Sequence, residues 1–305
     1  CGSHWGAPSR TMFRAMPMEP QMPKLLQSLQ GKVIAIFLVL IVISETALAL
    51  LSYYSSNTIF LNQTKASMQS ILTFRSSNLA NELRQIGDQA SSLAKIESLG
   101  KSMVNLKSGW KSLDKHPGDA RKELQQYFVQ DNPNPADQRE KLIKPEGPGG
   151  YYYSAHEELQ PQLAKVLAAT PFQDMLMLDA KGYVIYSYRK GEAFAENATD
   201  PKFAETSLGR VFAETMANVA KAETDEVPGA FSGLAMNKQT GKSDIYAAVP
   251  LVNLGQLRGI FVFQVRDEVV GKILAMGIPE GSSEKTNIIT ADGTVMGLDG
   301  EGRLA

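Results

Sequence analysis

The strongest pattern in the sequence is an apolar run that begins at Val33. Residues 33–43 are apolar throughout, and after Glu45 the run continues to Tyr53 and Tyr54, which gives the length of a bilayer-spanning helix. Thirteen Val, Ile, Leu and Phe residues lie between Val33 and Leu51. They contribute about −4 to −8 kcal/mol to insertion, against about +3 kcal/mol for Glu45. The pattern predicts a transmembrane helix over residues 33–54.

Basic residues indicate the orientation of this span. Four Lys or Arg residues lie within residues 10–32, and only Lys65 and Arg75 follow soon after the run, so residues 1–32 are expected to be a cytoplasmic tail. Everything after residue 55 is then exported. Two alternatives stay open: a cleaved signal peptide with its small-residue site at Ala47–Ala49, and a buried helix of a soluble core.

Helical spacing continues after the span, from Thr58 to about Leu99, without a proline. Apolar residues recur there at intervals of seven, at Leu72, Leu79, Ile86 and Leu93. The pattern predicts one long helix, which either pairs with a second copy or packs on its own domain. Loops rich in Pro and Gly follow at 114–118 and 145–150, and a further helix is predicted over 156–169.

Beyond Pro171 the spacing becomes strand-like. The segments 175–178 and 183–188, joined by a turn over 179–182 that contains Gly182, predict a β-hairpin. A helix is predicted over 208–220, and three further strands over 230–236, 243–251 and 259–265. Five antiparallel strands with flanking helices indicate the α+β class.

The hairpin pattern recurs over Asn287–Met296, where Gly293 lies 111 residues after Gly182. This repeat predicts the start of a second copy of the domain. The chain is therefore divided into 1–32 (cytoplasmic tail), 33–54 (transmembrane helix), 55–170 (long helix with helical and loop segments), 171–280 (first α+β domain) and 281–305 (start of the second copy).

Composition and charge exclude several classes of function. Thirty-one Lys and Arg residues balance 32 Asp and Glu residues, so the chain has no basic field for nucleic acid. The single cysteine excludes an internal disulfide and a thiolate zinc site. Thr240–Ser243 resembles the end of a phosphate-binding loop, but Met236 stands where that loop needs glycine. We therefore expect no catalytic centre, no metal and no cofactor.

The order of one span, a long helix and a hairpin-bearing α+β domain resembles the double Cache sensor region of bacterial methyl-accepting chemotaxis transducers. The resemblance covers residues 30–300. Its matching positions include Tyr127, Asp131–Pro135, Arg139, Tyr152, His156, Pro161, Asp174, Leu178, Asp179, Gly182, Val184, Tyr186, Ser187, Phe194, Asn197, Leu208, Gly209, Phe212, Pro250 and Gly259–Gln264. The departures are Arg189-Lys190 and Ala193-Phe194 in place of the family's Lys-Glu and Asp-Phe steps, and Leu234 in place of an aromatic residue.

This resemblance implies a PAS-like membrane-distal Cache domain over 171–280 and a truncated membrane-proximal one after it. It also implies a homodimeric receptor of the inner membrane whose periplasmic or extracellular domain senses a small molecule. Signals would pass to cytoplasmic signalling proteins through an output domain that this fragment lacks. Related sensor regions precede nucleotide cyclases and histidine kinases, so an enzyme's sensor remains an alternative. An exported solute-binding protein, released by cleavage after Ala49, is a third possibility.

Aromatic and polar residues near the predicted hairpin form the candidate ligand-binding set: Tyr152, Tyr153, His156, Tyr186, Tyr188, Arg189, Asp244 and Tyr246. A small-molecule pocket needs apolar rings together with a few oriented donors and acceptors. Arg189 could hold a carboxylate and Asp244 an ammonium group, so an amino acid, an organic acid or an amine is expected. Alternatively, Tyr186 and Tyr246 are core residues and His156 is a packed helix residue.

Overall fold

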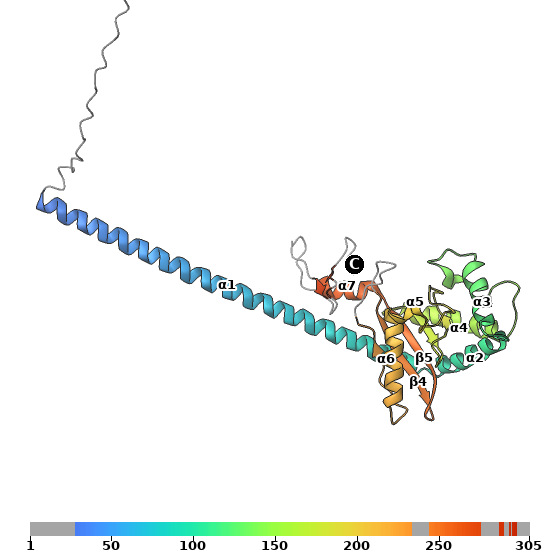
Figure 1. The fold of residues 1–305 in the computed structure, drawn as a ribbon. Helices are drawn as coiled ribbons and strands as arrows, with labels where there is room; N and C mark the ends of the chain where they lie inside the picture. The colour runs from blue at the N-terminus through green and yellow to red at the C-terminus, as the bar shows by residue number, and fades with distance from the viewer. Residues whose placement is uncertain (1–27, 234–243, 276–286, 290–292, 294, 298–305) are drawn as a thin grey trace, which may run out of the picture. The chain divides into compact units, whose positions relative to one another are not determined.

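The structure, a computed structural model, describes residues 28–233, 244–275, 287–289, 293 and 295–297 (Figure 1). The chain divides into two compact units, residues 1–70 and 71–305. The first unit contains most of the helix α1 (Leu29–Ala94). An 18-residue window of α1 is apolar enough to cross a membrane, and none of that window is buried. Residues 33–54 therefore form a candidate membrane span, whereas residues 1–27 of the predicted tail lie outside the described part of the chain.

The C-terminal part of α1 belongs to the second unit and packs on its own domain. Ile86, Ala90 and Ala94 are buried in the core there. The prediction that this helix reaches Leu99 is wrong, because the backbone at Ile96 is extended and a new helix, α2 (Glu97–Leu113), begins after it. Apolar spacing continues across this break and no proline or glycine marks it, so periodicity could not detect it.

A helical layer follows α2. It consists of α3 (Asp119–Gln125), the π-helical turn η2 (Gln126–Gln130), the short 3-10 turn η3 (Arg139–Lys141) and α4 (Tyr151–Ala168). The helix α4 begins five residues before the predicted start at 156. The reason is that Tyr152 and Tyr153 are buried against the core, which stabilises an additional helical turn after Gly150.

Five antiparallel strands form the sheet, in the order β2-β1-β5-β4-β3, and this confirms the predicted α+β class. The strands are β1 (Phe172–Leu178), β2 (Val184–Ser187), β3 (Ala230–Phe231), β4 (Tyr246–Asn253) and β5 (Gln256–Val265). The turn between β1 and β2 is as predicted: Gly182 has a φ of +89°, and the Asp179 carboxylate accepts the N–H groups of Lys181 and Tyr183. Residues 234–243, which include parts of two predicted strands, lie outside the described residues.

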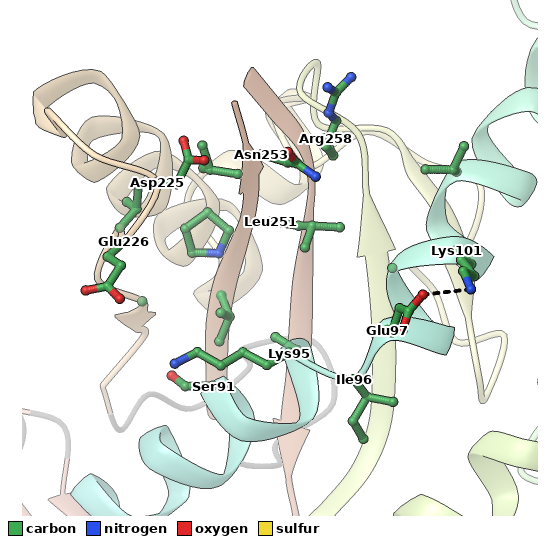
Figure 2. A pocket seen from close by; sticks show the side chains of 18 of the residues that line it. Ser91, Lys95, Ile96, Glu97, Lys101, Asp225, Glu226, Leu251, Asn253 and Arg258 are labelled. Carbon is green, nitrogen blue, oxygen red and sulfur yellow. Dashed lines mark ion pairs between the residues drawn. The ribbon is translucent and has the colours of Figure 1, made fainter. Parts of the chain in front are cut away.

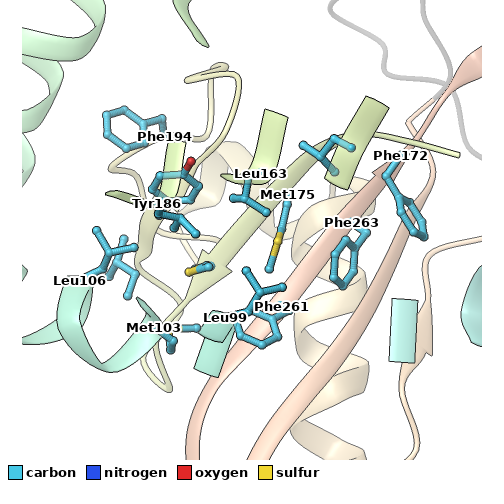
Figure 3. Close-up of a cluster of buried hydrophobic side chains, with 14 of the residues drawn as sticks. Leu99, Met103, Leu106, Leu163, Phe172, Met175, Tyr186, Phe194, Phe261 and Phe263 are labelled. Carbon is cyan, nitrogen blue, oxygen red and sulfur yellow. The ribbon is translucent and has the colours of Figure 1, made fainter. Parts of the chain in front are cut away.

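The two faces of this sheet carry separate groups of buried side chains. The face towards α2 and α4, here called the α4 face, includes Met175, Met177, Tyr186, Phe261 and Phe263, drawn in part in Figure 3. The opposite face, here called the α6 face, includes Leu176, Val262 and Ala248. It packs against α6 (Ser207–Lys221), which follows the short helix α5 (Pro201–Ala204) and matches the predicted helix closely.

After β5 the chain forms α7 (Asp267–Ala275). The described residues of the repeated hairpin pair as β6 (Ile288–Ile289) and β7 (Val295–Met296), antiparallel to each other. Gly293 has a φ of +84°, close to that of Gly182 in the first hairpin. The two predicted strands are thereby confirmed, residues 290–292 and 294 of the predicted turn lie outside the described residues, and the division of the chain at residue 281 stays a prediction.

Candidate functional site

A cavity of about 180 Å³ lies on the α6 face of the sheet. Strands β1, β2, β4 and β5 contribute to its lining, and the segment 191–194 and the region of α5 and α6 contribute the rest. The polar residues in this lining are Asp174, Ser187, Glu192, Lys202, Thr206, Asp244, Tyr246 and Gln264. Drug-sized ligands occupy pockets of about 300–1,000 Å³, so this cavity suits a smaller molecule.

A row of polar side chains crosses three strands in this cavity. Asp174 on β1 pairs in register with Gln264 on β5, and Gln264 pairs with Tyr246 on β4. Residues directly opposite each other on adjacent strands share a face, so sheet register brings these three side chains to one site. Gln264 Nε2 also donates to Asp244 Oδ1 at 3.1 Å, which adds the residue that lies two positions before β4.

Asp174 is the most deeply buried charged residue of the cavity lining, with 5% of its surface exposed. Its Oδ1 accepts the N–H groups of Met175 (2.7 Å) and Arg189 (3.1 Å), and its Oδ2 accepts the Ser187 hydroxyl (2.9 Å). Burial raises the pKa of Asp174, while these hydrogen bonds and the Lys190 charge act in the opposite direction. A buried acid with three donors is built into the wall in a fixed orientation.

The surroundings of Tyr246 are acidic. Burial raises the pKa of its hydroxyl well above the usual value, and the charges of Asp244, Asp174, Asp267 and Glu192 raise it further. Lys202 on α5, the one lysine of the cavity lining, forms an ion pair with Glu192 (3.2 Å). The cavity therefore combines several carboxylates, one lysine and a tyrosine hydroxyl, a set that favours an ammonium group and can also bind a carboxylate.

The structure brings only two of the eight predicted ligand-binding residues, Asp244 and Tyr246, to this cavity. Four others lie in the core on the α4 face, each with 1% or less of its surface exposed: Tyr152, Tyr153, His156 and Tyr186. The expected single group of eight is therefore not formed. Period-two alternation fixes which residues of one strand share a face. Whether Tyr186 on β2 and Tyr246 on β4 lie on the same face of the sheet depends on the pairing of the strands between them.

Each of the four core residues has a hydrogen-bond partner within the protein, although the buried Nε2 of His156 has none. The hydroxyl of Tyr152 donates to Ile185 O (2.7 Å), that of Tyr153 to Glu123 (2.7 Å), and that of Tyr186 to Gln160 (2.6 Å). His156 Nδ1 lies 2.8 Å from Ile143 O, and burial lowers the pKa of this imidazole well below its usual value. These contacts are those of a packed core.

Tyr188 and Arg189 lie beyond the end of β2. Tyr188 is half-buried and packs against the core of the α4 face. The Arg189 guanidinium donates to Asp137 O (3.1 Å), and only its backbone N–H reaches the cavity wall, through Asp174. Arg189 is thus not placed among the side chains that line the cavity.

A larger groove of about 940 Å³ lies between the α1–α2 junction, the loop 225–229 and the β4–β5 hairpin (Figure 2). Two of its carboxylates have partners: Glu97 pairs with Lys101 (2.7 Å), and Asp225 accepts the N–H groups of Leu254 and Gly255. The side chains of Glu97 and Lys101 are 83% and 72% exposed, whereas Asp174 in the smaller cavity is buried. Functional sites gather buried groups with shifted pKa values, so the smaller cavity is the better candidate despite its size.

Several residues of the candidate site had not been predicted, namely Asp174, Ser187, Glu192, Lys202, Thr206 and Gln264. Asp174 gave a usable signal, because a carboxylate within the apolar strand Phe172–Leu178 must have partners if it is buried. Lys202 and Glu192 gave none, since exposed charged residues are common on protein surfaces. Among the described residues, no group of three or more His, Cys, Asp or Glu side chains could hold a metal ion.

Comparison with known proteins yields structural neighbours only. No family model and no curated protein matches the chain. One neighbour is the sensor domain of the V. cholerae histidine kinase DctB, with 14% identity and a TM-score of 0.28, over 66% of this chain and 61% of that domain. A second is the ligand-binding domain of the Campylobacter jejuni chemoreceptor Tlp3 in complex with 4-methylisoleucine, with 11% identity and a TM-score of 0.31, over 67% and 72%.

A third neighbour is the ligand-binding domain of the Pseudomonas fluorescens chemoreceptor CtaA in complex with L-serine, with 14% identity and a TM-score of 0.26, over 72% of both chains. These neighbours are sensor domains of chemoreceptors and of a histidine kinase, the classes that the sequence resembles. This chain spans 61% of the length of the DctB domain. Because these three TM-scores are below 0.5, the fold described above rests on this chain's own strand order and register.

Proposed function

We propose that this chain is the extracytoplasmic sensor region of a membrane receptor that binds a small molecule carrying an ammonium group. The observation that carries this proposal is the polar row Asp174–Gln264–Tyr246 with Asp244, which lines a cavity on one face of an antiparallel sheet. The candidate span in α1 and the resemblance to double Cache regions support the placement in a membrane.

The ligand chemistry follows from the charges around the cavity. Asp174, Asp244 and Glu192 outnumber the one lysine of the lining, Lys202. An ammonium group near Asp244 and Tyr246 gains charge-assisted hydrogen bonds. A ligand that also carries a carboxylate can compete with Glu192 for Lys202. We therefore expect amines and small amino acids to bind, and organic acids without an ammonium group to bind weakly.

Three probes of similar size test this proposal: ethylammonium, propionate and alanine. They share a short carbon skeleton and differ in which charged groups they carry. Thermal shift and calorimetry of the full chain in detergent micelles should show saturable stabilisation by ethylammonium or alanine, because a ligand that binds only the folded state stabilises it. Binding of propionate alone, or of no probe, would overturn the assignment of ligand class.

The variant Asp244→Asn locates the binding site. It removes one charge beside Tyr246 and should weaken the binding of ethylammonium by about tenfold or more, since a hydrogen bond between charged groups contributes about 1.5–3 kcal/mol. Asp137→Asn is the matched control, because Asp137 is exposed on the opposite side of the sheet and lines no described cavity. Equal losses in both variants would place binding elsewhere.

For the output we propose chemotaxis signalling, on the strength of the residue-level resemblance to chemotaxis transducers. Ligand binding can shift signalling only if the two states of the receptor differ in affinity for the ligand. A histidine kinase or nucleotide cyclase is the alternative output. Reading the gene beyond the codon for Ala305 separates them, because a heptad-rich methylation region identifies a transducer and a catalytic domain identifies an enzyme.

A further inference from the structure

Lys190 is a buried lysine on the α4 face, close to the end of β2. None of its surface is exposed. Its Nζ donates to Gln160 Oε1 on α4 and to Tyr188 O (3.1 Å), and it lies 4.9 Å from the centre of the Tyr186 ring. Among the described residues, no carboxylate lies within 4.0 Å of this ammonium group. The charges of Asp174 and Glu140 act on Lys190 only from beyond that distance. A lysine buried without a direct ion pair is costly, so its retention calls for a reason.

The backbone of the same residue faces the cavity wall. Lys190 N–H donates to Ser187 Oγ (2.9 Å), and the Ser187 hydroxyl donates to Asp174 Oδ2 (2.9 Å). The neighbouring Arg189 N–H donates to Asp174 Oδ1 (3.1 Å). Residues 187–190 therefore wrap around the Asp174 carboxylate, and two of its three donors come from this turn.

The turn is held in a conformation that L-residues rarely adopt. Lys190 has a φ of +53°, in the left-handed region, where residues other than glycine and asparagine are disfavoured. Ala195, after the segment 191–194 that lines the cavity, has a φ of +60°. Such residues persist only where surrounding contacts hold them, and they concentrate at functional sites.

We propose that Lys190 is a positioning residue for the ligand cavity: its side chain, anchored to Gln160 on one face of the sheet, holds the turn that orients Asp174 on the other face. This inference rests on the proposed function of the cavity. It predicts that a residue which cannot touch the ligand sets the affinity for it. It also makes α4 the element whose position is linked to the cavity wall.

The variant Lys190→Met separates this role from a merely structural one. Methionine keeps the length and apolar stem of lysine but removes the charge and the donor. Gln160 Oε1 and Tyr188 O each keep another donor, so removing this buried charge should leave the thermal midpoint unchanged or higher. Affinity for the binding probe, ethylammonium or alanine, should nevertheless fall about tenfold. Hydrogen exchange at the amides of Arg189 and Lys190 should accelerate, because their acceptors are no longer held in place.

Two further variants complete the test, and all three variants are made in the full chain. Gln160→Met leaves Lys190 intact but removes the acceptor that Lys190 Nζ shares with the Tyr186 hydroxyl, together with two donors to backbone carbonyls. It should lower stability and also reproduce the fall in affinity and the faster amide exchange, and it carries the test if Lys190→Met does not fold. Thr215→Val is the matched control, since this buried hydroxyl donates to Val211 O within α6 and has no hydrogen-bonded path to Asp174. It should leave affinity and the two amides unchanged.

The outcomes of the two proposals are distinguishable. If the wild-type chain binds none of the probes, the proposed ligand class is wrong, while the amide-exchange measurement still tests Lys190 because it needs no ligand. If the wild-type chain binds a probe and Lys190→Met binds it equally well, or if both amides exchange at the wild-type rate, the positioning role is overturned.

Discussion

The two faces of the sheet are built from the same five strands, but one is packed as a core and the other borders a polar cavity. The α4 face fills its space with rings, among them Phe128, Tyr152, Tyr153 and Tyr186, and their polar tips find partners inside the protein. The α6 face leaves a cavity beside Tyr246 and places carboxylates around it. Tyrosine thus serves as a core residue on one face and as a cavity-lining residue on the other. Residue type alone does not mark a binding site; unfilled space beside polar groups does.

The largest expected effect compares two phenylalanines. Phe128 is fully buried on the α4 face, with its ring 4.4 Å from that of His156, and Phe128→Ala should destabilise the chain by about 3–5 kcal/mol. Phe203 borders the cavity and is 6% exposed, so Phe203→Ala should cost only about 1.5–3 kcal/mol. Chemical denaturation measures both. Equal losses would show that the α6 face is packed as tightly as the α4 face.

Alanine substitutions at two buried glycines test whether the cavity on the α6 face arises because the helices there pack loosely. A Cβ on Gly109 would lie 2.5 Å from Tyr152 Cα, and one on Gly209 would lie 2.2 Å from Phe203 O. Alanine at either position should cost about 1–3 kcal/mol, because backbone on both faces must move. Gly87→Ala is the control: nothing lies within 4 Å, so helix propensity should raise stability by about 0.5–1 kcal/mol. If Gly209→Ala causes no loss of stability, the helices on the α6 face are packed loosely enough to accept the added methyl group.

The pH dependence of stability should have opposite signs on the two faces. The pKa of His156 is lowered by burial, so the unfolded chain takes up a proton near pH 6.5 when the folded chain does not. Its contribution is present above about pH 6.5 and is lost as pH falls towards the lowered value, by up to about 1.4 kcal/mol per pH unit. Denaturation between pH 7.5 and 5.5 should show a smaller loss for His156→Gln, which keeps a donor for Ile143 O.

Asp174 on the α6 face should act the other way. Its pKa is raised, so its contribution is present below the unfolded value near 3.8 and is lost as pH rises through the folded value. The wild-type chain should therefore lose stability as the pH rises from about 4, and Asp174→Asn should show a smaller loss. A variant profile parallel to that of the wild-type chain would show that the carboxylate is not desolvated.

The smallest expected effect concerns the ion pair at the cavity. The side chains of Glu192 and Lys202 are 56% and 48% exposed, and such pairs contribute about 0–1 kcal/mol. Lys202→Met should leave stability within that range but weaken the binding of alanine more than that of ethylammonium, because only alanine carries a carboxylate. Calorimetry with both probes measures the difference, and an equal change for both would remove Lys202 from carboxylate recognition.

Most of the fold could be predicted because its signals are local. Alternating apolar residues located four of the five strands to within a few residues, and Asp179 and Gly182 identified the turn between β1 and β2. The break at Ile96 could not be predicted, since apolar spacing runs through it. The start of α4 at Tyr151 was missed because an aromatic run after glycines has no helical periodicity of its own.

The candidate site was predicted only in part, and its missing members show why. Asp244 and Tyr246 were found as a polar–aromatic pair in one strand-like segment. Asp174 joins them through strand pairing with Gln264, which lies 90 residues away in sequence. Two of its hydrogen-bond donors, Ser187 and Arg189, lie at the end of the neighbouring strand β2 and just beyond it. No spacing rule within one segment can anticipate contacts that three segments make together.

The sequence by itself determined the apolar segment that can span a membrane, the order of the strands, and which residues of each strand share a face. These follow from side-chain periodicity and turn chemistry, which act over a few residues. Only the tertiary structure decided that Tyr186 lies in a core and Tyr246 beside a cavity, and that Lys190 and Asp174 are linked around the end of a strand. Sheet register and helix docking bring distant residues together, and they determine what each face of a strand meets.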